Sequence, residues 1–179
     1  MARSLALVAL TLLVIQGVLA YDPTITADFG LMGPVTGFVA QFPGVTGLGI
    51  SSIFFKLGSG GLVPLHIHSR ATELFIAVQG TWTVGFIDSA NTHYTAQLKE
   101  GDQFVFPVGL IHYQLAGNSA ATGYSSFNSE NPGVTLIGSN IFTATPPIPD
   151  AVATGSFGID AATLASIRKA LAPPPPPSP

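Results

Sequence analysis

The sequence predicts an all-β domain, a sandwich or barrel of many short antiparallel strands. From Gly49 to Gln114 the chain alternates between short runs rich in Val, Ile, Phe, Thr and Trp and turn-forming Gly, Asp, Asn or Pro residues. β-Branched and aromatic residues favour strands, and the residues between the runs favour tight turns. Few of the runs exceed about eight residues, a length typical of strands. The clearest runs occupy residues 50–57, 73–79, 81–87 and 103–108.

Residues 1–20 have the features of a secretory signal peptide. Arg3 provides a positively charged start, an apolar run follows from Leu5 to Val14, and Ala20 is a small residue at the expected cleavage position. The apolar run is short for a stable membrane span, which favours cleavage over an uncleaved anchor. No later stretch reaches the roughly 18 apolar residues that a membrane helix needs. We therefore expect a secreted protein that has no membrane segment after cleavage.

An arm and then the β-domain follow the signal peptide. Residues 21–48 are rich in Gly, Pro and Thr and show no sustained period, which predicts an extended arm with one or two short strands. Residues 49–145 form the predicted β-domain. We expect strand structure to continue to about Phe142, because the segments YSSFNS and GVTLIGSNIF keep the same character.

The C-terminal part has a different pattern. Three prolines between residues 146 and 149 end the strand region, and residues 146–172 predict a pair of short helices. Asp160 is a good N-cap for the second helix, which should run to Leu171 with an apolar stripe on one face. Five consecutive prolines within residues 173–179 predict a polyproline II tail.

The composition excludes some partners and favours others. Charged residues make up 8% of the chain, against about 25% in typical soluble domains. The formal net charge is −3 and the few basic residues are scattered, so a nucleic acid partner is not expected. A folded chain with so few charges must hide much of its surface, and we expect a homo-oligomer. The chain has no cysteine, so its stability must come from packing, metal binding or oligomer contacts.

Two segments contain the candidate metal ligands. In HIHSRATE, His66 and His68 are two residues apart, and alternate side chains of a strand face the same side. Glu73 begins an apolar run, where an unpaired buried carboxylate would be costly. A cation shared with the imidazoles would offset that cost, and GDQFVFPVGLIHYQ supplies a fourth ligand in His112. These ligand types suit a divalent first-row metal ion, but they do not by themselves distinguish manganese from zinc or iron.

Other polar and aromatic residues have simpler interpretations. His93 lies beside Asn91 and Thr92 in a predicted hairpin turn and is not expected to be a ligand. Asp102 is interpreted as a turn residue, whereas Gln114 shares a strand face with His112 and is a candidate to contact a ligand. Four aromatic residues are predicted to be part of the hydrophobic core, namely Phe75, Trp82, Phe104 and Phe106.

The two segments together resemble the two sequence motifs of the cupins. The first motif matches at Gly60, His66, His68, Glu73 and Gly80. The second matches at Gly101, Pro107, Gly109 and His112. The phrases HIHSRATELF, EGDQFVFPVGLIHYQ and NPGVTLIGSNIF resemble the germin-like proteins of plants in particular, and the similarity extends from about Gly49 to Leu171.

The resemblance implies a jelly-roll β-barrel with a short C-terminal helical pair. It also implies secretion to the apoplast or cell wall and one manganese ion per chain, held by His66, His68, Glu73 and His112. In this family the C-terminal helices join neighbouring barrels, which implies a trimer or a hexamer made of trimers. The sequence departs from the family in lacking the usual cysteine pair and N-glycosylation sequon, and Ala116 occupies the position of the last motif residue, usually Asn.

Three functions are compatible with this resemblance. The first is an extracellular manganese superoxide dismutase, because a metal site with one carboxylate ligand keeps a net positive charge that attracts a small anion such as superoxide. The second is a non-catalytic ligand-binding or receptor-like protein of the cell wall. The third is a storage (nutrient reservoir) or structural protein in which the metal stabilises the fold. Fold alone does not decide between them.

Oxalate oxidation, which some germins perform, is not expected here. The resemblance implies that, in those germins, the oxalate is oriented by two asparagines, which lie three and thirteen positions before the first ligand histidine. In this sequence the two positions are Val63 and Ile53, and neither side chain can donate a hydrogen bond.

Overall fold

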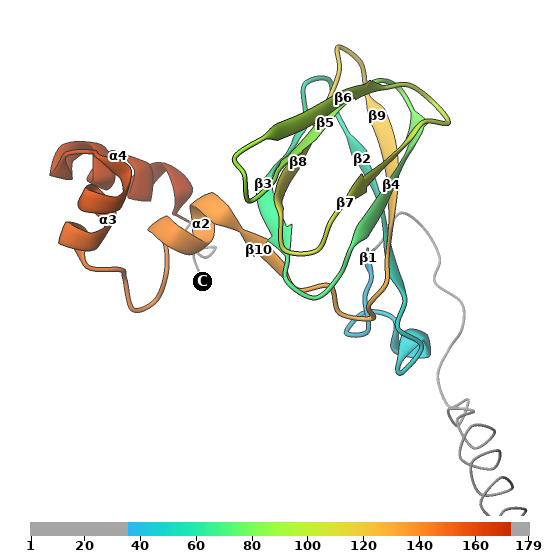
Figure 1. The fold of residues 1–179 in the computed structure, drawn as a ribbon, viewed down its shortest axis with the longest axis horizontal. Helices are drawn as coiled ribbons and strands as arrows, with labels where there is room; N and C mark the ends of the chain where they lie inside the picture. Colours follow the sequence, from blue (N-terminus) through green and yellow to red (C-terminus); the bar gives the residue numbers. More distant parts are fainter. Residues whose placement is uncertain (1–35, 173–179) are drawn as a thin grey trace, which may run out of the picture.

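The computed structural model describes residues 36–172, which form a two-sheet β-barrel followed by helices (Figure 1). The predicted signal peptide at residues 1–20, the first part of the predicted arm and the tail at residues 173–179 lie outside the described residues. None of the helices between residues 36 and 172 combines the length and the apolar character of a membrane span.

Each sheet has five strands, and all neighbouring strands are antiparallel. In spatial order, the first sheet contains β1 (Thr36–Gly37), β2 (Ser51–Leu57), β9 (Ala121–Phe127), β4 (Glu73–Gln79) and β7 (Gln103–Phe106). In spatial order, the second contains β10 (Val134–Leu136), β3 (Leu62–His68), β8 (Ile111–Ala116), β5 (Trp82–Ile87) and β6 (His93–Leu98). Strands that are neighbours in a sheet are therefore often distant in sequence, as in a jelly roll. The predicted all-β jelly-roll class is confirmed.

The alternation of buried and exposed residues along the strands shows which face points into the barrel. Along β8 the buried positions are His112, Gln114 and Ala116, and along β4 they are Glu73, Phe75 and Ala77. Strand geometry places alternate side chains on opposite faces, so these residues share the interior. The interior is polar where β3, β8, β9 and the start of β4 meet, and an apolar cluster fills the part around Phe75 and Trp82.

The apolar part of the interior is the hydrophobic core. Phe75 and Trp82 are fully buried, and their rings meet edge to face with centroids 5.1 Å apart. Each such aromatic pair stabilises the fold by about 1 kcal/mol beyond the stabilisation that comes from burying the apolar surface of the rings. The predicted core positions Phe75, Trp82 and Phe106 are confirmed, whereas Phe104 is only partly buried and packs against the core from β7.

The arm is partly described. β1 pairs with β2, and a short 3-10 helix, η1 (Pro43–Val45), follows it. Phe38 packs edge to face on Phe127 with ring centroids 5.5 Å apart, and the backbone N–H of Val39 donates to the carbonyl of Glu130. These contacts hold the described part of the arm against the first sheet.

The prediction that strand structure continues to Phe142 is wrong. Strand β10 ends at Leu136, and α2 (Ile137–Phe142) begins immediately after it. Ile137 and Ile141 are four residues apart, a helical spacing, and α2 packs against the last helix of the chain. Tertiary packing therefore overrides the strand preference of these β-branched residues.

The predicted helical pair is present as α3 (Asp150–Phe157) and α4 (Ala161–Leu171). Asp160 caps α4 as expected, because its carboxylate accepts a hydrogen bond from the Thr163 N–H at 2.7 Å. The three helices lie beside the barrel, on the side of β3 and β10 (Figure 1). Arg168 of α4 pairs with Asp150 of α3 at 2.6 Å and donates to the carbonyl of Ile148, which joins the two helices.

Candidate metal centre

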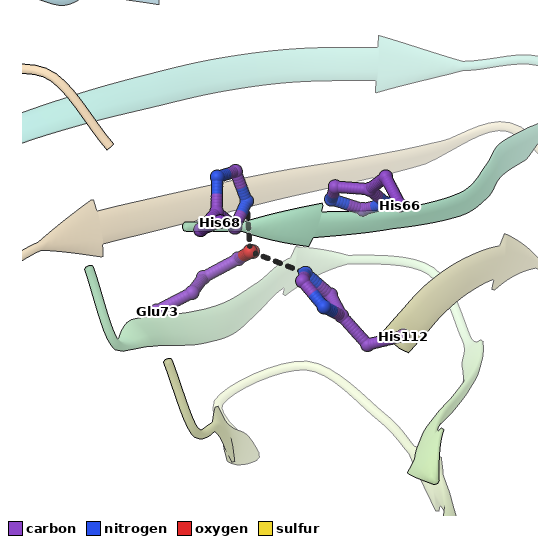
Figure 2. A group of neighbouring side chains, drawn as sticks. All are labelled: His66, His68, Glu73 and His112. Atoms are coloured by element: carbon purple, nitrogen blue, oxygen red, sulfur yellow. Dashed lines mark hydrogen bonds and ion pairs between the residues drawn. The ribbon is translucent and has the colours of Figure 1, made fainter. Parts of the chain in front are cut away.

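Four buried side chains from three strands converge inside the barrel (Figure 2). β3 contributes two of them, β4 one at its first residue, and β8 one directly opposite β3. All four are at most 4% exposed. We call this group the His/Glu cluster, and its members are His66, His68, Glu73 and His112.

The strand register explains why the cluster forms. His66 and His112 are cross-strand partners in the β3–β8 pair, so their rings meet with centroids 4.0 Å apart. His68 lies two residues further along the same face of β3. Glu73 starts β4 in the opposite sheet and points across the interior toward the histidines (Figure 2). The structure thus brings together all four residues that the sequence predicted to act as ligands.

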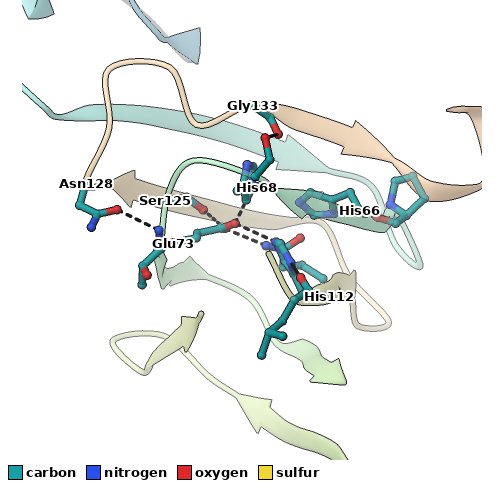
Figure 3. Close-up of polar contacts among 12 residues, drawn as sticks. His66, His68, Glu73, His112, Ser125, Asn128 and Gly133 are labelled. Carbon is teal, nitrogen blue, oxygen red and sulfur yellow. Dashed lines mark hydrogen bonds and ion pairs between the residues drawn. The ribbon is translucent and has the colours of Figure 1, made fainter. Parts of the chain in front are cut away.

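The two oxygens of the Glu73 carboxylate have different partners. Oε2 faces the histidines, at 2.9 Å from Nε2 of His68 and 3.1 Å from Nε2 of His112. Oε1 accepts a hydrogen bond from the Gln114 amide at 2.8 Å. It accepts a second from the Ser125 hydroxyl at 2.6 Å (Figure 3). Gln114 and Ser125 therefore fix the orientation of the carboxylate, and the expected contact of Gln114 with the cluster is confirmed.

Backbone carbonyls orient two of the three imidazole rings. Nδ1 of His66 is 2.8 Å from the carbonyl of Pro64, and Nδ1 of His112 is 2.8 Å from the carbonyl of Leu110. Each carbonyl can only accept, so in the neutral rings the Nδ1 atoms carry the protons and the Nε2 lone pairs are free to bind a metal ion. Such contacts typically orient histidines that bind metals.

The electrostatics keep the cluster ready for a cation. Burial lowers the pKa of His66 to about 4, and the neighbouring His112 adds to this shift. Burial by itself would raise the pKa of Glu73, but the close contacts of its carboxylate with His112 and His68 outweigh burial and hold that pKa near 2. At neutral pH, Glu73 is therefore a buried carboxylate and His66 a neutral imidazole.

The donor set fits a metal ion. One ligand atom from each of the four residues lies within 4.8 Å of the others. Two opposite metal–ligand bonds of roughly 2.1 Å span about 4.2 Å, so inward movements of a few tenths of an ångström complete the coordination. His112 supports the same conclusion, because its Nε2 faces a carboxylate while its Nδ1 already donates to a carbonyl. A cation between Nε2 and the carboxylate satisfies both.

A cavity of about 350 Å³ opens beside the cluster. Its polar lining includes His66, His68, Glu73, Gln114 and Ser125. The other lining residues are Thr36 and the apolar Phe38, Ile53, Phe55, Leu57, Val63, Phe127, Val134 and Leu136. A larger groove of about 520 Å³ lies outside the first sheet, against Leu74 and Tyr124, and includes no member of the cluster.

The remaining candidates from the sequence lie outside the cluster. His93 is exposed at the start of β6, where its Nε2 is 3.1 Å from the Tyr113 hydroxyl. Asp102 is a turn residue as expected, because its carboxylate accepts from the backbone N–H of Lys99 at 3.0 Å.

Ser125 was not predicted to belong to the site. It lies on β9, which is far from the two motifs in sequence, and β9 pairs with β4 so that Ser125 is opposite Phe75. Ser125 and Ser126 are adjacent and chemically identical, and only the strand register decides which of them reaches Glu73.

Comparisons with known proteins agree with the fold. Residues 17–164 match the cupin family model. Germin-like protein 5-1 of Oryza sativa subsp. japonica is 43% identical over 141 residues, which are 78% of this chain and 64% of the relative. Auxin-binding protein ABP19a of Prunus persica is 42% identical over 135 residues, which are 75% of this chain and 64% of the relative. The chain thus spans about 64% of the length of these relatives.

Among solved structures, a recombinant oxalate oxidase in complex with glycolate is similar with a TM-score of 0.78. Its sequence is 30% identical, and the match covers 83% of this chain and 84% of the oxidase chain. The family match extends across both sheets and all four residues of the His/Glu cluster. The chain therefore belongs to the cupin family and is a relative of the plant germin-like proteins.

Proposed function

We propose that this protein is a secreted, manganese-binding cupin of the apoplast or cell wall with superoxide dismutase activity. The observation that carries the proposal is the His/Glu cluster, whose four ligand atoms are buried and lie within 4.8 Å of one another. The signal-peptide pattern of residues 1–20 supports the extracellular location. The germin-like relatives support the choice of this cupin subgroup.

Bound manganese would supply a one-electron redox couple and a net positive charge beside the cavity. The residues of the chain orient the ligand atoms for that ion. His66 and His112 keep their Nδ1 atoms on backbone carbonyls, which leaves the Nε2 atoms free to coordinate. Gln114 and Ser125 hold the Glu73 carboxylate in place, so the binding of a metal ion requires only small movements of the ligands.

The cavity supports superoxide over oxalate as the substrate. Val63 and Ile53 line it, and neither can hydrogen-bond the oxygens of a dianion. Superoxide is smaller and carries a single charge, so it needs less orientation by side chains. We expect little or no oxalate oxidation by the manganese-loaded protein.

The test combines metal analysis with an activity assay. Purified protein should contain about one manganese ion per chain and dismute superoxide, lose the activity when the metal is removed, and regain it when manganese is restored. Zinc-loaded protein is the matched control, because zinc has no redox chemistry and should fill the site without restoring activity. Protein that binds no metal, or that is inactive when fully loaded with manganese, would contradict the proposal.

A non-catalytic ligand-binding function is the second candidate. It is favoured by the largely apolar cavity beside the cluster and by similarity to a relative named as an auxin-binding protein. In that case the loaded protein would bind a small organic ligand but would not dismute superoxide. The same metal-loaded preparation therefore separates the two candidates.

A further inference from the structure

The outer face of the first sheet carries three rows of side chains. Ile53, Ser125 and Glu73 point into the barrel, so their neighbours along β2, β9 and β4 point outward. The strand register places these outward residues side by side. In order along the strands, the rows are Ser52, Ser126 and Leu74, then Phe54, Tyr124 and Ile76, then Lys56, Thr122 and Gln79. A row with two aromatic rings therefore lies between two rows that carry hydrogen-bonding groups.

Two hollows follow these rows. One, of about 520 Å³, is lined by the first row and by Tyr124. The other, of about 390 Å³, is lined by Phe54, by the third row and by Glu100. Phe54 and Tyr124 are cross-strand partners, so the hollows adjoin at the aromatic row, and we call them together the outer groove. The four residue steps from Ser52 to Lys56 span about 13 Å, which is long enough for a short oligomer in an extended conformation.

The polar groups of the outer groove suit a neutral ligand that is rich in hydroxyl groups. Hydroxyl and amide side chains such as Thr122 and Gln79 both donate and accept hydrogen bonds. Lys56 and Glu100 bring one charge of each sign, and within residues 36–172 neither side chain forms an ion pair. Because the two charges cancel, the groove attracts neither a polyanion nor a polycation.

A polysaccharide satisfies these groups better than a protein surface does. A dry protein interface over the outer groove would bury the charges of Lys56 and Glu100 without partners, which is costly. Sugar hydroxyl groups donate to the carboxylate and accept from the ammonium group, directly or through water. The rings of Phe54 and Tyr124 provide apolar area on which the C–H faces of sugar rings can pack.

We propose that the outer groove binds an extended neutral polysaccharide, a β-1,4-linked glycan whose sugar rings present flat C–H faces. The rings of the glycan pack at the aromatic row, and its hydroxyl groups reach the polar rows on either side. The outer groove and the His/Glu cluster lie on opposite faces of the first sheet, so this inference does not depend on the metal site. Such a site holds the protein on an extracellular polysaccharide.

The test measures binding to the purified protein by calorimetry. Cellohexaose and xylohexaose are the neutral probes, and hexagalacturonate is an acidic probe of the same number of sugar units. We expect at least one neutral probe to saturate one site per chain, and hexagalacturonate to bind at least about tenfold more weakly than that probe. Metal-free and manganese-loaded protein should bind the neutral probe equally, because the outer groove contains none of the cluster residues.

Variants identify the residues that hold the glycan. Tyr124→Ala should weaken binding by about tenfold, whereas Tyr124→Phe keeps the ring and should retain most of the affinity. Gln79→Ala changes an exposed side chain and should weaken binding without disturbing the fold. The matched control is Val105→Ala, because Val105 is 50% exposed on β7 of the same sheet and lines neither hollow. The melting temperature of each variant shows that it is folded.

The outcomes separate this inference from its alternatives and from the proposed function. The inference is overturned if neither neutral probe binds, if hexagalacturonate binds more tightly, or if Tyr124→Ala and Gln79→Ala both leave the affinity unchanged. Binding that appears only after residues 21–35 are deleted would assign the groove to that segment instead. A smaller mass for Tyr124→Ala in light scattering, without glycan binding by the unmodified protein, would assign the groove to a second copy. A protein that binds the glycan but takes up no manganese would overturn the proposed function alone.

Discussion

At the scale of single residues, Glu73 organises the site. Its side chain is 2% exposed and contacts donors from β3, β8 and β9. A buried carboxylate is tolerated only when such partners offset its lost hydration. The carboxylate joins the two sheets across the barrel interior, so the same contacts serve both the stability of the fold and the geometry of the cluster.

Replacing His68 with alanine should remove most of the bound metal. The change deletes one of four ligands, and we expect manganese affinity to fall by at least about 100-fold. The gain in melting temperature that manganese gives the unmodified protein should be lost as well. Metal content and melting temperature, measured with and without manganese, check both points. His93→Ala is the control, because His93 is exposed and lies outside the cluster.

Acid should destabilise the metal-free protein in two windows. The pKa of His66 is lowered from 6.5 to about 4, so between these values the unfolded chain binds a proton that the folded chain does not, and stability falls as pH falls. Across this window the free energy of unfolding falls by on the order of 3 kcal/mol. The pKa of Glu73 is lowered from 4.5 to about 2, so its contribution is present above pH 4.5 and is lost as pH falls toward 2.

Urea unfolding of metal-free protein between pH 7 and pH 3 measures this dependence. The His66→Asn variant should lose the slope in the upper window and keep the slope in the lower one. Unfolding midpoints that are independent of pH in the unmodified protein would contradict the assignment of either group.

At the scale of strands and helices, the spacing of the sequence predicts the cluster well. Side chains of a strand alternate, so HIH places two ligands on one face without knowledge of the fold. Ser125 could not be predicted in this way, because its role depends on the pairing of β9 with β4. The sequence predicts a strand where α2 lies, because Ile137 and Ile141 favour strands locally, whereas the packing of α2 on α4, β3 and β10 is a tertiary effect that the local pattern does not contain.

The turn between β4 and β5 requires glycine at position 80. Gly80 has φ +78°, and a Cβ atom there would lie 2.9 Å from the Cβ of Ala121 and 3.0 Å from the carbonyl oxygen of Ala120. Gly109 has a similar φ of +76° but has open space around it. We expect Gly109→Ala to cost about 1–2 kcal/mol from backbone strain. Gly80→Ala should cost more, because the turn must also move away from β9.

Urea unfolding of these two variants gives the comparison directly. Equal losses of unfolding free energy would show that the contact with Ala120 and Ala121 does not matter.

At the scale of the whole molecule, the helices bury part of the apolar surface that an oligomer would otherwise cover. The apolar stripe of α4 does not need a second copy, since Leu164 is 1% exposed and α4 packs against α2 and α3 of the same chain. An oligomer is still favoured by the low fraction of charged residues and by the apolar side chains that the helices leave exposed. Val152 is 54% exposed, Phe157 47% and Leu171 37%.

We therefore propose that the face of α3 and α4 joins neighbouring copies in a trimer or a hexamer made of trimers. Large exposed apolar side chains on a protein with 8% charged residues favour self-association, and closed symmetry limits its size. Light scattering at micromolar concentration should give a mass of three or six chains. Phe157→Glu should reduce that mass to one chain, because a charge in the buried centre of an interface is costly. Val105→Glu adds the same charge on β7, away from the helices, and should leave the mass unchanged. A monomer mass for the unmodified protein would contradict the proposal, and an unchanged mass for Phe157→Glu would move the interface to another face, such as the exposed Leu62 and Leu65 of β3.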